Sequence, residues 1–360
     1  MKNYKLLCAP MATLSHEAFR RMIERFGGCD EYYTEMINAG SLLTRGPFEK
    51  YYLMNGPVPE KIVWQLTGSK TEHLAAAAKT VAALGGIGVD LNMGCSAPEI
   101  YHSGAGISWM LKPLEETQNM VRSVQDALVS FASSAGTRPM RLSVKLRLGD
   151  EDFTEASFFR FTDMLVQEGV TRLVLHPRTK KEKYSRPPRW QYVEQLACRY
   201  QDDSISVILN GAVKDCASAA AAMEAAPHAE GIMIARAAVQ KPWLFAELAH
   251  MIEKGGTALE ESGYSDVHPN RSAAPESGVF CIDLQQLALD YLDDIQKYQP
   301  PEFWKTRAQR FFTYYCDNFS FAHYAQSQML NASDLDDSRR RLAAYFEKVP
   351  EDRFLLSSHF

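Results

Sequence analysis

Short apolar runs, rich in β-branched residues, alternate along this chain with longer segments whose apolar residues recur with a helical period. Strands that alternate with helices form parallel sheets, because each helix returns the chain to the same end of the sheet. The chain is therefore predicted to be an α/β protein. Eight strands are expected, at Tyr4–Ala9, Glu31–Met36, Ile62–Leu66, Gly88–Met93, Leu142–Leu148, Arg172–Pro177, Ser206–Val213 and Gly231–Ala237.

Amphipathic segments between these runs predict helices at Ser15–Phe26, Thr71–Leu84, Glu115–Ser134, Thr154–Glu168, Trp190–Gln201 and Asp215–Ala226. Each of four segments starts with a residue that can cap a helix N-terminus, namely Ser15, Thr71, Thr154 and Asp215. Glycines follow three of the segments, at positions where a left-handed residue commonly ends a helix: Gly27, Gly85 and Gly169.

Six polar residues fall at or just past the carboxyl ends of five of the predicted strands: Gln65, Asn92, Lys145, Arg147, His176 and Asn210. An open, doubly wound sheet would gather such residues at one switch point. In a closed barrel the strand ends instead converge on one mouth, where the active site is built. The spread of polar residues over many strands favours a (β/α)8 TIM barrel.

The length of 360 residues exceeds the roughly 250 that such a barrel needs. We assign residues 1–250 to the barrel and 251–281 to a linker, because this stretch is rich in Gly, Ser, Pro and charge. From Ile282 onward the apolar period is helical again. Residues 282–360 are therefore expected to form a small C-terminal α-helical bundle domain.

Composition limits the class of protein. Apolar residues make up 46% and charged residues 23%, as in ordinary globular proteins. No apolar run approaches the roughly 18 residues of a membrane helix, so no membrane association is expected. The stretch Leu6-Leu7-Cys8 is too short for the core of a signal peptide and reads as the first strand, so we expect a cytoplasmic protein.

The chain has seven cysteines, at wide spacings and without a C-x-x-C pair. This pattern predicts neither a disulfide framework nor a metal site. The net charge of −5 argues against a nucleic-acid binder, although a local basic face can exist on an acidic protein.

Seven motifs occur at the strand ends in barrel order. They are Cys8-Ala9-Pro10-Met11, Gln65-Leu66-Thr67-Gly68, Asn92-Met93-Gly94-Cys95, Lys145-Leu146-Arg147, His176-Pro177-Arg178-Thr179, Asn210-Gly211 and Ala235-Arg236-Ala237. Their order and spacing closely resemble the tRNA-dihydrouridine synthase family, over about Lys5 to Phe245. The resemblance implies an FMN-dependent enzyme that uses NADPH to reduce the C5–C6 bond of uridine in tRNA to dihydrouridine.

The resemblance also implies which residues hold FMN. Lys145, Gln65 and His176 would contact the flavin ring, and Pro10-Met11 would form its floor. Independently of the resemblance, a flavin phosphate in a barrel needs donors at the tops of the last two strands. Asn210-Gly211 and Ala235-Arg236 stand there. The alternative for Lys145 is a structural ion pair with an acidic neighbour such as Glu35.

Cys95 follows the fourth strand and is expected to face the mouth. Reduction of a uracil ring needs a hydride at C6, which the flavin supplies, and a proton at C5. An ordinary thiol, with a pKa near ~8.5, is protonated at neutral pH and can serve as this acid. The family's catalytic cysteine matches this position.

A basic loop with one aromatic residue, residues 178–189, is expected at the mouth and could contact RNA. Its candidate contacts are Arg178, Lys180, Lys181, Lys183 and Tyr184, to which we add Asn92 and Arg147. Two further basic clusters lie in the C-terminal region, and each is either an RNA contact or a solvated helix face: Lys305, Arg307 and Arg310, and Arg339–Arg341.

Two other functions remain open from the sequence. One is a flavin barrel that reduces a free pyrimidine or an enone, similar to dihydroorotate dehydrogenase. The other is a tRNA-binding protein that has lost catalysis, because Ser96 follows Cys95 where the family commonly has proline, and Pro177 follows His176 where glycine is typical. The sequence selects neither the uridine that is modified nor an oligomeric state.

Overall fold

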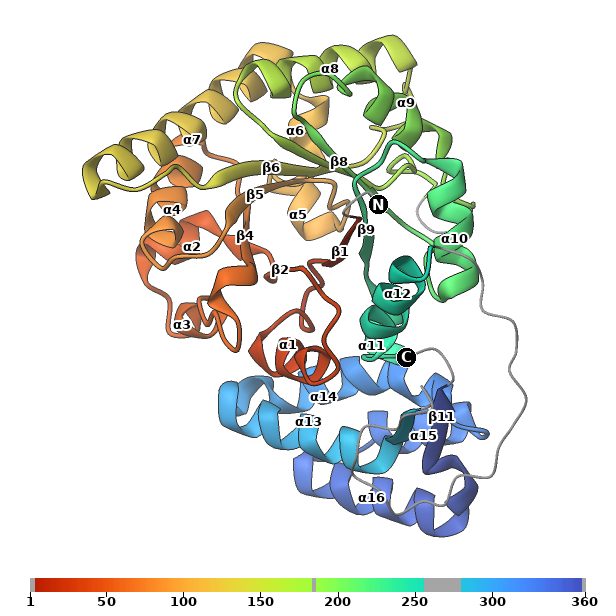
Figure 1. Cartoon of the computed structure of the whole chain (residues 1–360). Helices are drawn as coiled ribbons and strands as arrows, with labels where there is room; N and C mark the ends of the chain where they lie inside the picture. The colour runs from red at the N-terminus through yellow and green to blue at the C-terminus, as the bar shows by residue number, and fades with distance from the viewer. Residues whose placement is uncertain (1–3, 183–185, 256–279, 358–360) are drawn as a thin grey trace.

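The computed structural model describes residues 4–182, 186–255 and 280–357, and its larger part is a closed parallel barrel (Figure 1). Each strand pairs in parallel with the next one around the barrel, and β1 pairs with both β2 and β9, which closes the sheet. The strands are β1 Lys5–Cys8, β2 Glu31–Tyr33, β4 Ile62–Thr67, β5 Gly88–Met93, β6 Arg141–Leu146, β7 Arg172–Leu175, β8 Ser206–Asn210 and β9 Gly231–Ile234. The predicted (β/α)8 TIM barrel is confirmed.

The long helices lie outside the strands, as predicted: α1 Glu17–Glu24, α4 Thr71–Ala82, α7 Leu114–Ala135, α8 Glu155–Gln167, α9 Gln191–Arg199 and α10 Cys216–Ala225. Thr154 and Asp215 cap their helices through side-chain oxygens. The expected caps at Ser15 and Thr71 are wrong, since the N-caps are His16 and Lys70. The Ser15 hydroxyl instead accepts from the Met11 N–H at 2.7 Å and donates to the Ala9 carbonyl at 2.8 Å, which fixes the turn after β1.

Several shorter elements were not predicted, because two to six residues are too few to show a period. Around the barrel these are β3 Ile37–Asn38, which pairs with the end of β4, and the helices α2 Ala39–Thr44, α3 Glu49–Tyr52, α5 Pro98–His102, α6 Ser108–Leu111 and α11 Arg236–Gln240. The longer α12, Leu244–Glu253, also lies outside the predicted helices. Both α5 and α6 lie in the stretch that follows Cys95, so they shape the mouth.

Side chains two positions apart on a strand point to the same face, so the barrel interior is built in layers. At the amino end Glu31 accepts hydrogen bonds from Arg141 and Arg172, each at 2.6 Å at its shortest. Burial alone would raise the pKa of Glu31, but the two guanidinium groups hold it below its ordinary value. Above this layer lies an apolar one that includes Leu7, Val63 and Ile208. The polar side chains at the carboxyl end of the barrel therefore lie above a closed apolar layer.

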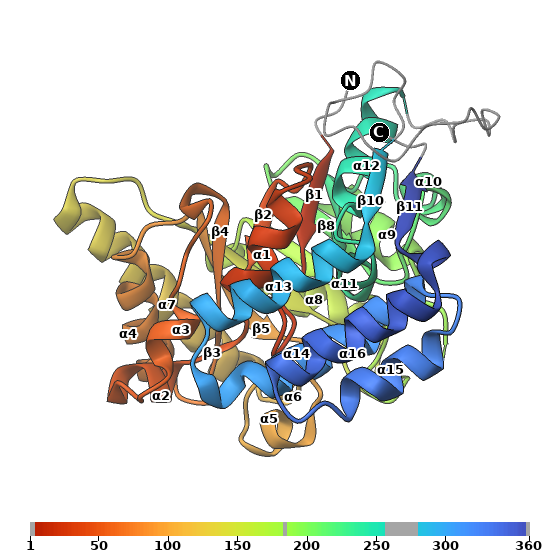
Figure 2. The same cartoon turned by 90° about the horizontal axis from the view of Figure 1, so that it is seen from below.

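The C-terminal helices form a separate bundle against one side of the barrel (Figures 1 and 2). They are α13 Leu284–Tyr298, α14 Pro301–Tyr315, α15 Ala322–Leu330 and α16 Leu335–Lys348. An unpredicted antiparallel pair, β10 Phe280–Asp283 and β11 Phe354–Ser357, joins the two ends of the bundle. The predicted linker lies largely outside the described residues, so the domain boundaries stay a prediction.

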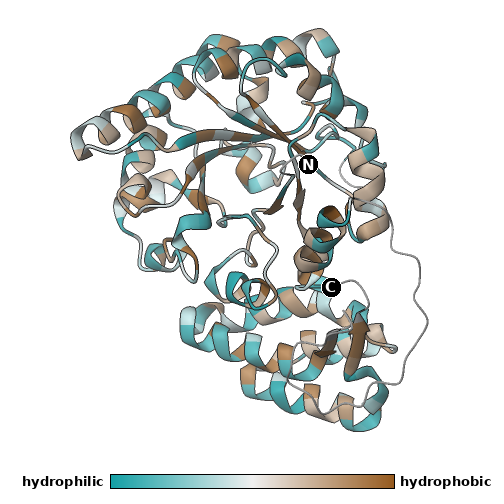
Figure 3. Cartoon of the chain, viewed as in Figure 1, coloured by the Kyte–Doolittle hydropathy of each residue, from teal (hydrophilic) through white to brown (hydrophobic). Residues whose placement is uncertain are grey.

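The bundle meets the barrel through α13, which packs on α1, and through α14. Arg307 of α14 donates to Glu35, just after β2, at 2.8 Å, and both side chains are buried. In Figure 3 the barrel strands are mostly brown, whereas the helices of both domains alternate between brown and teal. Within the part of the chain that the structure describes, no helix is long and apolar enough to span a membrane.

Candidate active site at the barrel mouth

The structure brings the predicted polar residues together at the carboxyl end of the barrel. Gln65 and Asn92 lie on β4 and β5, Lys145 lies on β6, and His176 directly follows β7. Asn92 and Lys145 are direct cross-strand partners. These residues are far apart in the sequence but lie close together in the structure, because parallel strands end at the same edge.

A chain of hydrogen bonds runs from the barrel interior to the backbone of Cys95. The Gln65 amide donates to Asp90 at 2.7 Å, and the Gln65 carbonyl oxygen accepts from the Asn92 amide at 2.9 Å. The Asn92 carbonyl oxygen then accepts from the backbone N–H of Cys95 at 2.9 Å. Ser143 supports the inner end by donating to Asp90 at 2.7 Å. Cys95 is thus held by a network of buried side chains.

The loop after Cys95 closes tightly on itself. The Cys95 carbonyl accepts from the N–H of Ile107 at 3.0 Å, and a Cβ at Gly106 would lie 2.5 Å from this carbonyl oxygen. Gly106 also has a φ of +60°, so glycine is required there on both counts. Pro98 occupies the first turn of α5, where a missing N–H costs no hydrogen bond. The Ser96-Ala97-Pro98 sequence is therefore compatible with a short helix directly after the cysteine.

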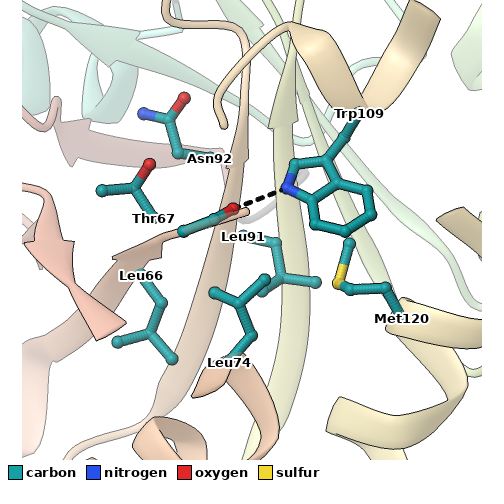
Figure 4. Close-up of a pocket in the computed structure, with 8 residues that line it drawn as sticks. Leu66, Thr67, Leu74, Leu91, Asn92, Trp109 and Met120 are labelled. Carbon is teal, nitrogen blue, oxygen red and sulfur yellow. Dashed lines mark hydrogen bonds between the residues drawn. The ribbon is translucent and has the colours of Figure 1, made fainter. Parts of the chain in front are cut away.

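Trp109 anchors the far end of this loop (Figure 4). Its indole N–H donates to the Gly68 carbonyl at 2.8 Å. In Figure 4 the ring lies beside Leu91 and Met120, and Thr67 and Asn92 lie together at the strand ends. Both ends of the Cys95 loop are thus attached to the ends of β4 and β5.

Lys180, in the loop after β7, contacts the Cys95 loop. Its ammonium lies 3.6 Å from the centre of the Tyr101 ring of α5 and 3.0 Å from the carboxylate of Asp150. The hydrogen bond to Asp150 raises the pKa of Lys180. The loops after β5, β6 and β7 are therefore tied together at one point.

The mouth is strongly positive. Burial lowers the pKa of His176 to about 2, with added repulsion from Lys145, Arg147, Arg178 and Arg236. Burial and the Arg147 charge lower the pKa of Lys145 to about 8, while Asp90 partly opposes them. The suggested ion pair of Lys145 with Glu35 is wrong, because Glu35 pairs with Arg307 and with the Thr13 N–H. No carboxylate of the described residues lies within salt-bridge distance of Lys145.

His176 is held as a neutral ring. A guanidinium can only donate, so Nε2 of His176 accepts from Nη1 of Arg178 at 2.9 Å. Gly211, with a φ of +120°, lies so close that a Cβ there would be 2.8 Å from the His176 ring. Asn210 donates to the carbonyl of Met233 at 2.8 Å, which joins the ends of β8 and β9. Ala235 and Arg236 directly follow β9, so the four predicted phosphate residues lie on adjacent strand ends.

Several of the basic residues predicted to contact RNA at the mouth make hydrogen bonds or ion pairs within the protein. Arg178 is buried and donates to the Arg186 carbonyl at 2.6 Å, and Arg147, also buried, donates to the carbonyls of Gly94 and Thr179. Lys181 is exposed on the rim, at 2.9 Å from Glu151. Lys183 and Tyr184 lie outside the described residues. The RNA contacts at the mouth therefore stay a prediction.

The two basic clusters of the C-terminal helices were expected to be either RNA contacts or solvated helix faces, and several of their residues form ion pairs within the protein. Arg307 is buried in its pair with Glu35, so it belongs to the domain interface and cannot contact RNA. Arg339, Arg340 and Arg341 each pair with an aspartate of the bundle. Lys305 and Arg310 are exposed.

Two polar residues of the site were not predicted. Asp90 is fully buried, and its burial raises its pKa to about 6 against the hydrogen bonds from Gln65 and Ser143. It stands two positions before Asn92, so strand alternation would have pointed it into the same interior. Thr67 is buried at the end of β4, and its hydroxyl has no hydrogen-bond partner among the described residues. A bound ligand could satisfy this hydroxyl.

A parallel barrel with a thiol, a neutral imidazole and several cations at its carboxyl end has the architecture of a (β/α)8-barrel enzyme that binds an anionic ligand. The family model described as dihydrouridine synthase matches residues 7–268. The chain is 30% identical over 248 residues to a probable tRNA-dihydrouridine synthase of Aquifex aeolicus, covering 68% of this chain and 73% of the relative. A probable tRNA-dihydrouridine synthase of Rhodobacter capsulatus is also 30% identical, covering 68% of this chain and 70% of the relative.

A third relative, from Helicobacter pylori, is 29% identical over 255 residues, or 70% of this chain and 73% of its own, and bears the same name. The chain belongs to the dihydrouridine synthase family. The matched region covers the barrel and ends before the helical bundle.

Proposed function

We propose that this chain is an NADPH-dependent tRNA-dihydrouridine synthase, which reduces the C5–C6 bond of uridine in tRNA with bound FMN. The observation that carries this proposal is the position of Cys95. The Asp90–Gln65–Asn92 network holds the backbone of this thiol residue at a mouth that collects four cationic side chains around a neutral histidine.

The residues present fit FMN. An anionic cofactor needs positive charge in a partly desolvated site, and Lys145, without a carboxylate partner among the described residues, offers it. Gln65 and His176 would contact the ring, with Pro10 and Met11 as its floor. The phosphate would be held by Asn210, Gly211, Ala235 and Arg236. The unpartnered hydroxyl of Thr67 adds one more donor at the same mouth.

Bound FMN would supply the hydride needed at uracil C6. The protein must then provide a proton for C5. Without an acid, the carbanion that develops at C5 would give the hydride back, and uracil would re-form. Cys95 supplies this proton. His176 is a poor acid for the step, because a pKa of about 2 leaves it neutral and its Nε2 accepts a hydrogen bond from Arg178.

The tRNA would approach over the rim that carries Lys181 and Lys180, with Arg178, Asn92 and Arg147 deeper in the mouth. Lys183 and Tyr184 continue the same loop, and the helical bundle would add a second contact with tRNA. A cytoplasmic location belongs to the same proposal.

The test has two parts. The purified protein is expected to show flavin absorption, and its reduced flavin should be reoxidised by a uridine-containing tRNA with formation of dihydrouridine. Reoxidation by a free pyrimidine or an enone, and not by tRNA, would favour a small-molecule reductase instead. Tight binding of tRNA without any flavin would favour a protein that has lost catalysis.

A further inference from the structure

Three residues with metal-binding side chains meet on the outside of the barrel, far from the mouth. Glu194 and Cys198 lie one turn apart on α9, and His228 lies in the loop between α10 and β9. Sγ of Cys198 is 3.4 Å from Nδ1 of His228 and 3.3 Å from Oε1 of Glu194. Oε1 of Glu194 and Nδ1 of His228 are 2.5 Å apart. One atom from each side chain therefore points at a common centre.

This cluster lies at the amino end of the barrel. His228 and Glu230, which directly precedes β9, line a cavity of about 200 Å³ together with Ile205 and Val207 at the start of β8. The mouth is at the other end of these same strands. A ligand bound here would not touch the residues assigned to the reaction.

We propose that Glu194, Cys198 and His228 form a Zn²⁺ site. A thiolate, an imidazole and a carboxylate together select zinc over the hard cations Mg²⁺ and Ca²⁺, which prefer all-oxygen sites. Zinc–ligand bonds of about 2.0–2.3 Å in a tetrahedron place the ligand atoms roughly 3.3–3.6 Å apart. The two distances from Sγ already lie in or near this range, and only the Glu194–His228 contact must open, by about 0.8 Å.

The surroundings support binding. The backbone N–H of His228 donates to Oε2 of Glu194 at 3.0 Å, which leaves Oε1 directed at the centre. The cavity lies beside His228 and is also lined by Glu230, and a water molecule would fill the fourth position of the tetrahedron. On binding, the Cys198 thiol releases its proton to water and its sulfur bonds the metal. The metal would join α9 to the loop before β9.

The spacing of the cysteines gave no sign of this site, because its ligands come from two elements and only one of them is a cysteine. The test is titration with Co²⁺, which takes tetrahedral zinc sites and reports them through visible bands at longer wavelengths than flavin absorbs. We expect one equivalent to bind, with the visible d–d bands of a tetrahedral site that includes a thiolate, and Zn²⁺ to displace it. Zn²⁺ should also raise the thermal midpoint of the protein, since a ligand that binds only the folded state stabilises it.

The variants Cys198→Ser and His228→Gln should each weaken Co²⁺ affinity by more than about tenfold, and Cys198→Ser should shift the visible bands away from those of a thiolate site. Cys281→Ser is the matched control, because Cys281 is also exposed but lies in β10. Folding of each variant is checked by its thermal midpoint without metal. An unchanged cobalt spectrum in Cys198→Ser, or no stoichiometric binding to the unmodified protein, would overturn the proposal.

Discussion

The carbonyl oxygen of the Asn92 side chain accepts the backbone N–H of Cys95 at 2.9 Å, while the Asn92 amide donates to Gln65 at 2.9 Å. One asparagine thus connects the proposed acid to the barrel interior. Because Gln65 also binds Asp90, the position of the cysteine backbone depends on three buried polar side chains on two neighbouring strands.

Replacing Asn92 by alanine removes both of these hydrogen bonds and a longer third one from the Gly94 N–H, at 3.3 Å. The loss of buried hydrogen bonds costs roughly 1–3 kcal/mol, so we expect flavin reoxidation by tRNA to slow by about tenfold to a hundredfold. Flavin content should stay intact, and Asn92→Asp, which keeps the acceptor for Cys95, should retain more activity. Asn119→Ala, at an exposed asparagine of α7, is the control. Equal rates in Asn92→Ala and the control would remove Asn92 from the positioning of Cys95.

Cys95→Ala removes the proposed acid and leaves the rest of the mouth in place. Reduction of the flavin by NADPH should survive, while its reoxidation by tRNA slows by the ~10²–10⁴-fold typical of a positioned acid. Cys95→Ser should resemble the alanine variant, because a hydroxyl is a far weaker acid than a thiol. Single-turnover reoxidation, followed together with dihydrouridine formation, measures the effect. A rate within about threefold of the unmodified protein, where chemistry limits turnover, would contradict the assignment.

Much of this mouth was predictable from the sequence, since Gln65, Asn92, Lys145 and His176 interrupt strands that are otherwise fit only for burial. Closure of a parallel barrel then forces them together. Asp90 was missed because it lies inside the predicted strand Gly88–Met93 rather than near its carboxyl end, and its two hydrogen-bond partners come from other strands.

Arg307 was misjudged for a different reason. The helical period of α14 shows that one face is buried but cannot show which partner covers it. Only the docking of the bundle on the barrel turns a basic residue of a helix into the buried partner of Glu35. The Glu194–Cys198–His228 cluster was not predicted for the same reason, because it depends on the packing of α9 against a loop that is distant in the sequence.

The low pKa of His176 gives the protein a specific acid sensitivity. The pKa of His176 in the folded protein, about 2, lies below the ordinary value of 6.5. Between these two pH values, His176 binds a proton in the unfolded chain but not in the folded protein. Stability from this residue is therefore present above pH 6.5 and is lost as the pH falls below it, by up to about 1.4 kcal/mol per pH unit.

His176→Gln should reduce that dependence. Urea unfolding between pH 7 and 5 would show a shallower fall in the free energy of unfolding for the variant. His323→Gln, in the exposed part of α15, should keep the slope of the unmodified protein. Parallel slopes for His176→Gln and the unmodified protein would mean that His176 is protonated in the folded state.

Removing Arg307 should destabilise the contact between the domains. Arg307→Met leaves the buried carboxylate of Glu35 without its cation, which typically costs about 3–5 kcal/mol. Glu35→Gln combined with Arg307→Met should recover part of this loss, since no buried charge remains. Arg310→Met, at an exposed position of the same helix, should change the free energy of unfolding by less than about 0.5 kcal/mol. Chemical denaturation distinguishes these outcomes, and a loss in Arg307→Met no larger than in Arg310→Met would contradict the buried pair.

The last prediction separates two neighbouring lysines. Lys181 is exposed on the rim, whereas Lys180 contacts Tyr101 and Asp150 in the loops after β5 and β6. If tRNA crosses this rim, Lys181→Met removes one phosphate contact, so the slope of log affinity against log salt should fall by about 0.7–0.9. Lys180→Met should change the slope no more than this, but it should also slow flavin reoxidation by bound tRNA, because the Cys95 loop loses its contact with the loop after β7.

Tyr101→Leu keeps the Lys180 charge and removes only the aromatic contact. It should therefore slow reoxidation while leaving the salt slope unchanged. Salt titrations of tRNA binding, paired with single-turnover reoxidation at saturating tRNA, resolve the two effects. If Lys181→Met leaves both affinity and slope unaltered, the tRNA path does not cross this rim, and the exposed Lys305 and Arg310 of α14 become the positions to test.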